Sequence, residues 1–340
     1  MFFKDERVLV TGAAGLIGSN LVRRLVREGA IVRGTLRRKE PPVREPGVEY
    51  VACDLTRKKD CRAVVQGMRY VFHCAASTSG ALQTASRPMV HVTPNVVMNA
   101  LLLEAAYEAG VEKFLWPSST TGYPPADHPV REEEMFQGEP FEKYFFTGWS
   151  KRFSEILCRM YGEKLTPRMT TIVLRPSNVY GPHDKFDFTH SHVTAALIRK
   201  VVERHDPIEV WGTGDDVRDL IYVDDFVEAA LRALERLSGF EVLNIGLGKG
   251  YTVKQVLQTI LELDGYADAR IVFNPSRPTM IPVRLVDTSK AERLLGFRAR
   301  TDLSEGLRQT IDWYRARDRV GCGVGGRGGA QRSPGAADRA

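Results

Sequence analysis

The sequence predicts an α/β protein in which helices cover both faces of a parallel sheet. Segments with the apolar pattern of short buried strands alternate with segments of helical spacing, from residue 6 to about residue 175. The first strand leads through a glycine-rich turn straight into a helix. A chain of 340 residues, 43% of them hydrophobic, can bury one large core and a smaller second one. These observations predict a doubly wound Rossmann sheet over residues 1–175 and a smaller C-terminal substrate-binding lobe over 176–318, partly interleaved with the sheet.

The turn within residues 8–20, VLVTGAAGLIGSN, predicts a dinucleotide-binding site. Gly12 permits the tight turn after the strand, Gly15 allows the backbone to approach a pyrophosphate, and Gly18 allows the helix to pack closely on the strand. Free backbone N–H groups at the start of the helix, at Leu16 and Ile17, would face the phosphates. Because a strand precedes the glycines and a helix follows them, we favour this site over an ordinary tight turn.

The second strand, residues 31–36, is followed by Arg37, Arg38 and Lys39. A dinucleotide fold that selects NAD places a carboxylate here to hold the ribose hydroxyls, whereas one that accepts the 2′-phosphate of NADP places an arginine. We therefore predict NADP(H), with NAD as the alternative cofactor, and Arg37 and Arg38 as the phosphate clamp. A solvated basic turn is the alternative reading of this segment.

The strands that follow bring small and polar residues to one edge of the predicted sheet. We expect a strand that ends at Asp54, a helix over 58–66, a strand over 70–75, a helix over 95–109 and a strand over 113–118. Ligands of parallel sheets bind beyond the carboxyl ends of the strands. This edge is therefore predicted to carry Asp54, Ala75, Ala76 and residues 118–121.

The C-terminal half has a looser pattern, which predicts the smaller lobe. Helices are expected over 147–161, 192–203, 253–263 and 304–315, and strands over 170–174 and 208–211. Asp224 and Asp225 are expected to cap a helix that begins near Phe226 rather than to bind a metal ion, and no metal site is predicted. Residues 319–340 are Gly, Ala and Arg without apolar periodicity, so we predict a disordered tail.

Composition argues against several functional classes. No run approaches about 18 consecutive apolar residues, and MFFKDERVLV lacks the features of a signal peptide, so we expect a cytoplasmic protein that does not enter a membrane. The five cysteines form no CxxC pair, which suits a reducing compartment. The segment after residue 314 holds six arginines and two aspartates, and so carries four of the six net positive charges. The rest of the chain is nearly neutral, and nucleic-acid binding is not expected.

Several motifs together resemble a known enzyme family. TGAAGLIGS, CDL at Asp54, FHCAA in 72–76, SSTTGY in 118–123, Lys151 and RPSNVYGP in 175–182 resemble the extended short-chain dehydrogenase/reductases of the NAD-dependent epimerase/dehydratase family, which act on nucleotide sugars. GPHDKF, SHVTAALIRK, VWGTGDDVRDLIYVDD and SRPTMIPVRLVD are similar to segments of the GDP-fucose synthases within it, which epimerise and then reduce a 4-keto sugar with NADPH. The resemblance covers about residues 6–315 and implies a homodimer that pairs through helices including the one with Lys151.

The resemblance implies a catalytic serine and lysine but not the usual tyrosine. Ser119, four residues before Tyr123, matches the residue that polarises the sugar O4, and Lys151 matches the lysine that holds the nicotinamide ribose. The family acid/base is a tyrosine four residues before that lysine, where this chain has Thr147. An aliphatic hydroxyl is far less acidic than a phenol and is a poor general base. Three alternatives follow: Tyr144 takes the role, a water relay runs through Thr147, or the redox step is slow or lost.

The same resemblance implies further ligand contacts. Thr121 stands where the fucose synthases have a cysteine used in epimerisation, and His192 matches their second acid/base. Arg218 matches the pyrophosphate clamp and Arg277 a basic residue that binds the substrate, with Arg284 as a further candidate. The remaining implied contacts are Asn178 with the substrate, Pro176 and Ser177 with the nicotinamide, and Asp54 and Leu55 with the adenine.

Residues and resemblance together predict an NADP(H)-dependent enzyme that acts at C4 of a nucleoside-diphosphate 4-keto-6-deoxy hexose, by reduction or epimerisation. An NAD(P)-dependent 4-epimerase with no net redox change is the alternative among enzymes. A dinucleotide-binding protein with little catalysis is the alternative from another class, because Thr147 replaces the family tyrosine.

Overall fold

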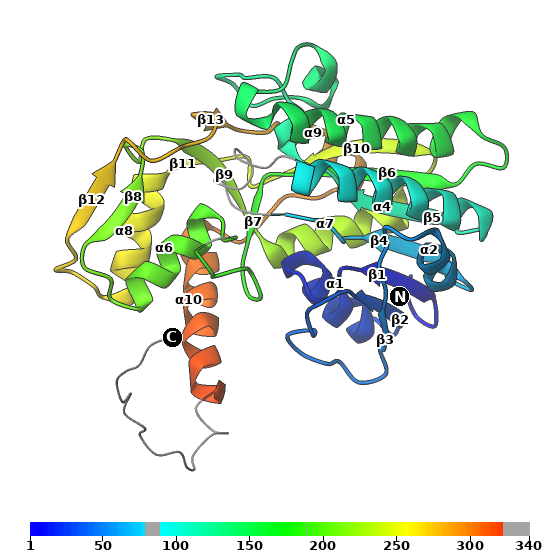
Figure 1. Cartoon of the computed structure of the whole chain (residues 1–340), viewed down its shortest axis with the longest axis horizontal. Coiled ribbons are helices and arrows are strands. Elements are labelled where there is room, and N and C mark those ends of the chain that lie inside the picture. The colour runs from blue at the N-terminus through cyan, green and yellow to red at the C-terminus, as the bar shows by residue number, and fades with distance from the viewer. Residues whose placement is uncertain (79–88, 189, 322–340) are drawn as a thin grey trace, which may run out of the picture.

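The central sheet of the computed structural model, which describes residues 1–78, 89–188 and 190–321, has seven strands (Figure 1). All neighbouring strands are parallel, in the order β10-β6-β5-β4-β1-β2-β3. The strands are β1 Arg7–Thr11, β2 Ile31–Leu36, β3 Glu49–Ala52, β4 Tyr70–His73, β5 Lys113–Pro117, β6 Thr170–Pro176 and β10 Phe240–Ile245. The strand order reverses at β1, as in a doubly wound sheet, and the predicted fold class is confirmed.

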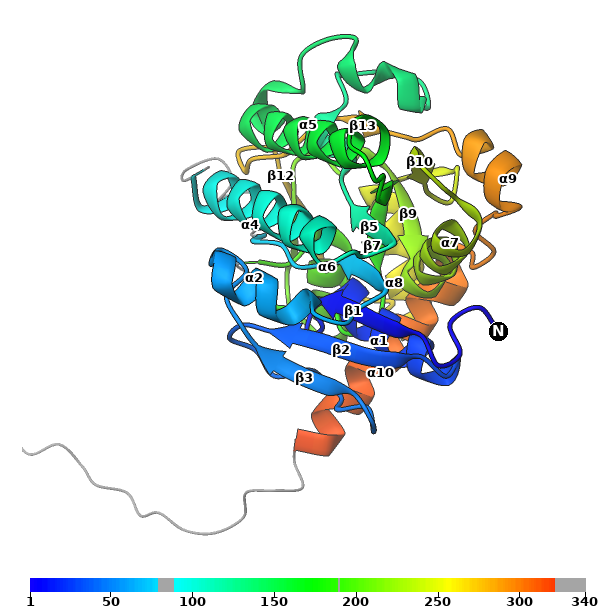
Figure 2. The same cartoon turned by 90° about the vertical axis from the view of Figure 1, so that its right-hand side faces the viewer.

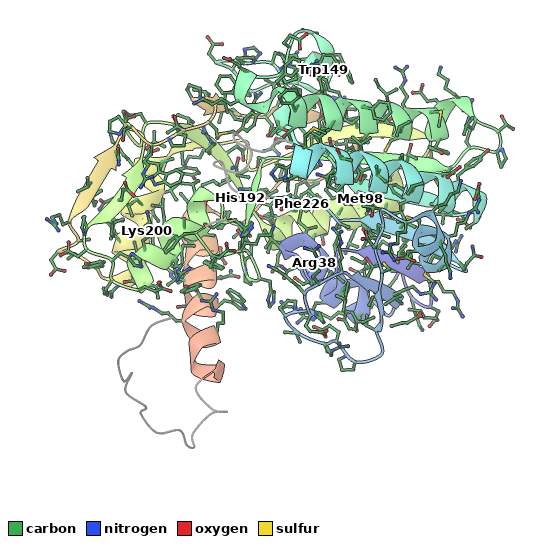
Figure 3. The ribbon with its side chains drawn as sticks, viewed as in Figure 1. Arg38, Met98, Trp149, His192, Lys200 and Phe226 are labelled. Atoms are coloured by element: carbon green, nitrogen blue, oxygen red, sulfur yellow. The ribbon has the colours of Figure 1, made fainter. Side chains whose placement is uncertain are left out.

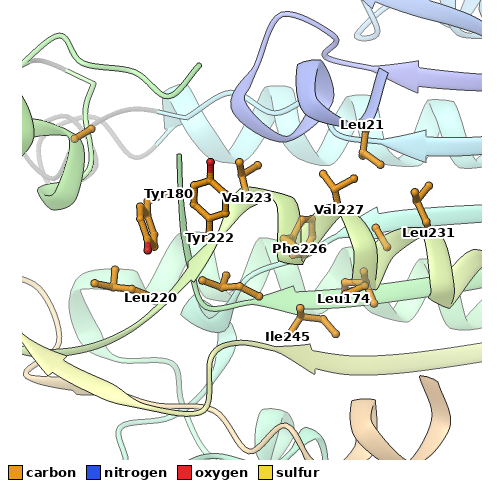
Figure 4. Packing of buried hydrophobic residues seen from close by; sticks show 14 of the residues in the cluster. Leu21, Leu174, Tyr180, Leu220, Tyr222, Val223, Phe226, Val227, Leu231 and Ile245 are labelled. Atoms are coloured by element: carbon orange, nitrogen blue, oxygen red, sulfur yellow. The ribbon is translucent and has the colours of Figure 1, made fainter. Parts of the chain in front are cut away.

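Helices cover both faces of this sheet (Figure 2). Along β1, Val8 and Val10 pack into the core on one face and Leu9 packs into the core on the other, because successive side chains of a strand point in opposite directions. The first face is covered by α1 Leu16–Arg27 and α7 Val223–Arg236, and the second by α2 Lys58–Val65, α4 Met89–Glu108 and α5 Phe145–Arg159. Figure 4 shows Phe226 of α7 between Leu21 of α1 and Leu174 of β6.

Most of the rest of the chain forms a group of elements beyond the carboxyl ends of the central strands (Figure 1), and the exception is α9 Ser289–Leu295, which packs against α7 and β10. Strand β6 leads directly into β7, which pairs with β9. Strand β9 also pairs with β13 in parallel and with β11 in antiparallel orientation. Strand β8 pairs with β12. The elements of this group are β7 Asn178–Tyr180, α6 Val193–Val202, β8 Ile208–Trp211, β9 Val217–Tyr222, β11 Gly250–Thr252, α8 Val253–Asp264, β12 Ile271–Asn274, β13 Val283–Arg284 and α10 Leu303–Gly321. Between α7 and β11 the chain returns to the central sheet as β10.

Local sequence explains where several helices begin and end. Thr252 caps α8 by accepting a hydrogen bond from the Gln255 N–H at 3.1 Å, and the Gln255 side chain accepts one from the Thr252 N–H at 2.8 Å. Helix α4 contains Pro94, which has no N–H for the carbonyl of Val90 four residues earlier. The Ser77 hydroxyl donates to that carbonyl instead, at 3.0 Å, so α4 begins at Met89 rather than at the predicted residue 95.

Two other predictions about helix ends are wrong. Asp224 and Asp225 do not cap α7, because the helix already begins at Val223; Asp225 instead accepts hydrogen bonds from the N–H groups of Arg300 and Thr301. Helix α10 includes residues 319–321 of the predicted tail, and residues 322–340 lie outside the described residues. No helix within the described ranges is long and apolar enough to cross a membrane.

Candidate active site

The turn between β1 and α1 has the geometry of a phosphate cradle. At Gly12, φ is +67°, and an added Cβ would lie 2.8 Å from the backbone just after β4. At Gly18, an added Cβ would clash with the Gly12 carbonyl, whereas at Gly15 it would meet only that carbonyl oxygen, at 3.4 Å. The cradle is therefore open at Gly15, and the N–H groups of Leu16 and Ile17 have no acceptor among the described residues. These residues fit a bound pyrophosphate.

A buried chain of hydrogen bonds links this turn to α5. The N–H of Ala75 donates to the Thr11 hydroxyl at 3.0 Å, which donates to Nδ1 of His73 at 2.7 Å. Nε2 of His73 donates to Oδ1 of Asn99 at 2.8 Å, and the Asn99 amide donates to the Ser154 hydroxyl at 3.0 Å. Burial lowers the pKa of His73 to about 4, so its ring is neutral near pH 7. This row of hydrogen bonds joins β1, β4, α4 and α5 where the cofactor would bind.

Ser119 follows β5 and is held by a short 3₁₀ turn, η1 Thr120–Gly122. Its Oγ accepts hydrogen bonds from the N–H of Thr121 at 3.2 Å and from the Thr121 hydroxyl at 3.1 Å. A hydroxyl has two acceptor positions and one proton. Both acceptor positions of Ser119 are used within the turn, so its own proton is the group left to donate to a ligand.

Helix α5 packs directly on this turn. An added Cβ at Gly148 would lie 2.7 Å from the Thr121 carbonyl oxygen, so a larger residue would separate the helix from the turn. One helical turn later, Nε of Arg152 donates to the Gly122 carbonyl at 2.8 Å. These contacts hold the Ser119 turn against the part of α5 that carries Lys151.

Lys151 places its ammonium group over the ring of Trp116 on β5, with Nζ 4.6 Å from the ring centre. It makes no hydrogen bond or ion pair to any side chain in the part of the chain that the structure describes. Burial lowers the pKa of Lys151 to about 8, and the charge of Glu155 offsets part of the effect. The ammonium group is thus half-buried, cationic at neutral pH and free to bind a ligand oxygen.

Glu155 and Arg175 form a buried ion pair beside the same turn. Nη2 of Arg175 lies 2.6 Å from Oε2 of Glu155, and the two side chains are 3% and 2% exposed. The Ser118 hydroxyl donates to Oε1 of Glu155 at 2.6 Å, and Nη1 of Arg175 donates to the Tyr123 hydroxyl and the Glu132 carbonyl, both at 2.8 Å. The pair therefore connects β6 and α5 to both ends of the segment that contains Ser119.

The end of β2 carries the predicted phosphate clamp. Nη2 of Arg37 forms an ion pair with Oδ2 of Asp54 at 3.1 Å, and Oδ1 of Asp54 accepts from the N–H and hydroxyl of Thr56. These bonds, those from Thr56 first, lower the pKa of Asp54. Arg38 is exposed and has no partner within the described residues; Figure 3 labels its position. The Leu55 side chain is buried in the core, so only its backbone can reach an adenine.

Two arginines lie side by side in the C-terminal lobe. Arg218 of β9 and Arg284 of β13 are register partners on adjacent strands. Arg218 pairs with Oδ2 of Asp216 at 3.2 Å. Arg284 is buried; its terminal nitrogens donate to the carbonyls of residues 123 and 124, and its Nε has no hydrogen-bond partner in the described structure. Burial lowers the pKa of Arg284 to about 10. Arg218 is paired with a carboxylate, whereas Arg284 donates to backbone carbonyls and has no ion pair within the described residues, which favours an anionic ligand.

The other predicted substrate residues lie on separate elements. Arg277 pairs with Glu209 at 3.4 Å, and its guanidinium lies 5.5 Å from the ring centre of Trp211 at the end of β8. His192 is exposed just before α6 (Figure 3). Burial raises the pKa of Asp184, and the electrostatic effect of His192 offsets part of this rise.

The start of β7 continues this edge of the sheet. Pro176 ends β6, Asn178 begins β7, and the N–H of Ser177 donates to the Ile245 carbonyl at 2.8 Å. Ala76, after β4, is exposed. The described residues contain no cluster of three or more His, Cys, Asp or Glu side chains that could hold a metal ion.

Comparison with known proteins identifies the family. Residues 8–246 match the NAD dependent epimerase/dehydratase family. The chain belongs to this family. GDP-L-fucose synthase of Sinorhizobium fredii is 31% identical over 326 residues, which cover 92% of this chain and 97% of that protein. The UDP-glucose 4-epimerase of Thermotoga maritima, solved with UDP-glucose, is 28% identical with a TM-score of 0.83, and MoeE5, solved with UDP-glucose and NAD, is 31% identical with a TM-score of 0.81. Each of these two alignments covers 92% of this chain and 99% of the solved chain.

This membership confirms the family, the extended short-chain dehydrogenase/reductase type and the class of enzyme predicted from the sequence. Family membership also supports a nicotinamide dinucleotide as the cofactor of this chain. When bound, that cofactor supplies or accepts a hydride at the substrate carbon. The assigned roles of individual side chains stay predictions.

Thr147 stands where the resemblance to the epimerase/dehydratase family implies a catalytic tyrosine. This residue is in the first turn of α5, four positions before Lys151, and its hydroxyl makes no hydrogen bond within the described residues. Tyr144 precedes α5 in the 3₁₀ turn η3 Glu142–Tyr144. Burial raises the pKa of Tyr144, and the charges of Arg218 and Arg284 offset part of the rise. The phenol is thus under the influence of the lobe arginines, whereas Thr147 lies one helical turn before Lys151.

Sequence reasoning missed the residues that hold this family site together. Glu155 carries a signal, because it follows Lys151 by four residues and so lies on the same helix face. Gly148 carries a weaker one, because glycine in a helix interior is costly and needs a packing reason. The missed residues are Trp116, Gly148, Arg152, Glu155 and Arg175.

Proposed function

We propose that this chain uses NADP(H) to reduce the 4-keto group of a nucleoside-diphosphate 6-deoxy hexose. The observation that carries the proposal is the state of Ser119. Thr121 fills both acceptor positions of its hydroxyl, so Ser119 can only donate its proton to a ligand. A donor fixed in this way favours negative charge on a ketone oxygen, which develops when carbon 4 is reduced.

Thr121 supports reduction over epimerisation at the carbons next to the ketone. Its hydroxyl donates to Ser119, so it is turned toward its own loop rather than offered to a substrate. Inversion at such a carbon removes a proton on one face and returns one on the other, which two groups perform most directly. Of the two groups that the resemblance to the fucose synthases implies for this step, the chain keeps His192 but has Thr121 in place of the cysteine.

The substrate class is supported by the lobe arginines and by the relatives. Arg218 and Arg284 lie on adjacent strands, Arg218 pairs with Asp216, and the Nε of Arg284 is buried without an acceptor in the described structure. A diphosphate would supply that acceptor and balance the charge. Two solved relatives hold UDP-glucose, so we assign a nucleoside-diphosphate sugar.

The test is incubation of the purified chain with NADPH and a panel of 4-keto-6-deoxy nucleotide sugars. Reduction predicts loss of NADPH absorbance in proportion to a product whose C4 is an alcohol by NMR. Binding of NADPH with no turnover on any member of the panel would refute the proposed function and favour a cofactor-binding protein.

A 4-epimerase is the second candidate, because the chain resembles the Thermotoga maritima UDP-glucose 4-epimerase over nearly its whole length. Such an enzyme oxidises and re-reduces the same carbon, so Ser119 and Lys151 would serve it equally well. It predicts interconversion of 4-hydroxyl nucleotide sugars with no net consumption of NADPH. The product analysis above therefore separates the two functions.

Arg38 is expected to set the preference for NADP over NAD. It has no partner in the described structure, whereas Arg37 is already paired with Asp54. Arg38→Ser should raise the Kd of NADPH about 10-fold to 100-fold, the value of one or two charge-assisted hydrogen bonds, and leave the Kd of NADH unchanged. Arg37→Ser should have the smaller effect. Equal losses for both cofactors, measured by fluorescence titration, would contradict the clamp.

The outer face of α5 supports the predicted homodimer. Phe146, Trp149, Phe153 and Ile156 follow helical spacing, and all four are exposed, Phe153 to 46%. A stripe of this kind is typical of a subunit interface. Phe153→Glu should convert a dimer to a monomer in light scattering, while Val272→Glu, at a 43% exposed position on β12, should not. A chain that is already monomeric before mutation would exclude the dimer.

A further inference from the structure

The ammonium group of Lys151 lies in an unusual setting for a half-buried charge. Its partner is an aromatic face, since Nζ is 4.6 Å from the centre of the Trp116 ring. The charge of Glu155, on the same helix, raises the pKa of Lys151, and the charge of Lys151 lowers the pKa of His73 on β4. The Glu155 carboxylate is already bound by Arg175 and by Ser118, and His73 is neutral. The described residues therefore leave this ammonium without an anion of its own.

Thr147 lies one helical turn before Lys151 and has a hydroxyl that could receive a proton from it. The two residues are four apart within α5 and so share one face of the helix. The helix cannot slide along the Ser119 turn, because Gly148 touches the Thr121 carbonyl and Arg152 donates to the Gly122 carbonyl. The Thr147 hydroxyl is half-buried and makes no hydrogen bond within the described ranges. The Thr147 hydroxyl can therefore donate and accept hydrogen bonds one helical turn from an ammonium group that has no anion.

We propose that Lys151 is the proton source of this enzyme and that the Thr147 hydroxyl passes the proton to the sugar O4, in place of the missing phenol. The inference rests on the proposed function. The C4 carbonyl gains a hydride at carbon, its π electrons move to oxygen, and O4 takes the Thr147 proton. Thr147 takes a proton from the Lys151 ammonium, which becomes a neutral amine and is recharged from solvent. The net change is ketone plus NADPH plus a proton to alcohol plus NADP⁺.

The electrostatics of the site agree with this assignment. Burial lowers the pKa of Lys151 to about 8, near the working pH that suits a general acid, whereas burial raises the pKa of Tyr144. Lys151 donates only while protonated, so the rate of reduction should be highest below pH 8 and should fall as the pH rises through about 8. Thr147 does not titrate in this range, and its role is tested by removing its hydroxyl.

The first measurement needs neither substrate nor cofactor. The full chain is labelled briefly with acetic anhydride at a series of pH values, and labelling of Lys151 is read by mass spectrometry. We expect half-maximal labelling near pH 8. Trp116→Phe weakens the cation–π contact and should move the midpoint to lower pH, by about half a pH unit. A midpoint near that of an ordinary lysine would overturn the inference whatever the activity shows.

The second measurement is the pH dependence of single-turnover reduction with saturating NADPH. Its midpoint should equal the labelling midpoint and move with it in Trp116→Phe. Thr147→Val should lower the rate about 100-fold or more, the range of general acid catalysis, and Thr147→Ser should restore most of it. Lys151→Arg keeps the charge but cannot give up a proton, so it should slow reduction at least as much as Thr147→Val, and the fall near pH 8 should be absent from the rate that remains.

Outcomes of the two measurements distinguish failure of the inference from failure of the function. A wild-type chain that reduces no keto sugar refutes the proposed function, and this inference with it. A chain that reduces keto sugars and keeps its rate in Thr147→Val refutes the relay alone. A pH dependence that vanishes in Tyr144→Phe but survives Thr147→Val would assign the proton to Tyr144.

Discussion

Replacing Arg175 with methionine is expected to lower the free energy of unfolding by about 3–5 kcal/mol, because it leaves a buried carboxylate without its counterion. Glu155 is 2% exposed and receives two nitrogens of Arg175, at distances from 2.6 to 3.2 Å. The same substitution leaves the Tyr123 hydroxyl and the Glu132 carbonyl without their donor. Methionine is similar in length to the lost stem, so the cost reflects the polar groups rather than a cavity.

Urea denaturation of the two proteins measures this loss. The matched control is Arg62→Met, which removes an ion pair to Glu108 whose side chains are 54% and 43% exposed, and it should cost less than about 1 kcal/mol. The double variant Arg175→Met with Glu155→Leu should be more stable than Arg175→Met alone, because no unpaired charge is then buried. Equal losses in Arg175→Met and the control would show that the pair does not support the fold.

The central sheet could be predicted from the sequence because its signals are local. Each strand is a short apolar run, each crossover has helical spacing, and the handedness of such connections leaves few topologies. The strand at residues 31–36 and the one at 208–211 were predicted with the bounds that the structure has. The sequence pattern does not predict the individual strands that surround β9. β13 has two residues and β11 three, and their pairing depends on partners more than 30 positions away.

The site could be predicted only in part, for a related reason. Gly12, Gly18 and Ser119 do their work through backbone shape and hydrogen bonds within a few residues, and such patterns are visible in a sequence. The side chains that face Lys151 and Tyr144 come from strands far away in the chain. Nothing in the sequence places Trp116 under Lys151, or the lobe arginines beside Tyr144, because tertiary packing decides those neighbours.

The glycine turn offers the second large effect, because two of its glycines are required for different reasons. An added Cβ at Gly18 would overlap the Gly12 carbonyl, which is backbone and cannot move aside, although alanine is otherwise the better helix residue. Gly18→Ala should therefore lower the free energy of unfolding by about 1–3 kcal/mol, the usual cost of overpacking. It should also displace the start of α1 from the phosphates and weaken NADPH binding about 100-fold or more, through loss of charge-assisted hydrogen bonds.

Gly15→Ala should separate these two consequences. Its added Cβ would make only an ordinary contact, 3.4 Å from the Gly12 oxygen, so the free energy of unfolding should change by less than about 1 kcal/mol. The same Cβ would point into the open side of the cradle and obstruct the pyrophosphate, so NADPH affinity should fall about as far as in Gly18→Ala. Thermal unfolding without cofactor and fluorescence titration with NADPH measure the two effects independently. If Gly15→Ala binds NADPH as tightly as the unmodified chain, the pyrophosphate does not lie against this turn, and the cofactor site has to be sought elsewhere along the edge of the sheet.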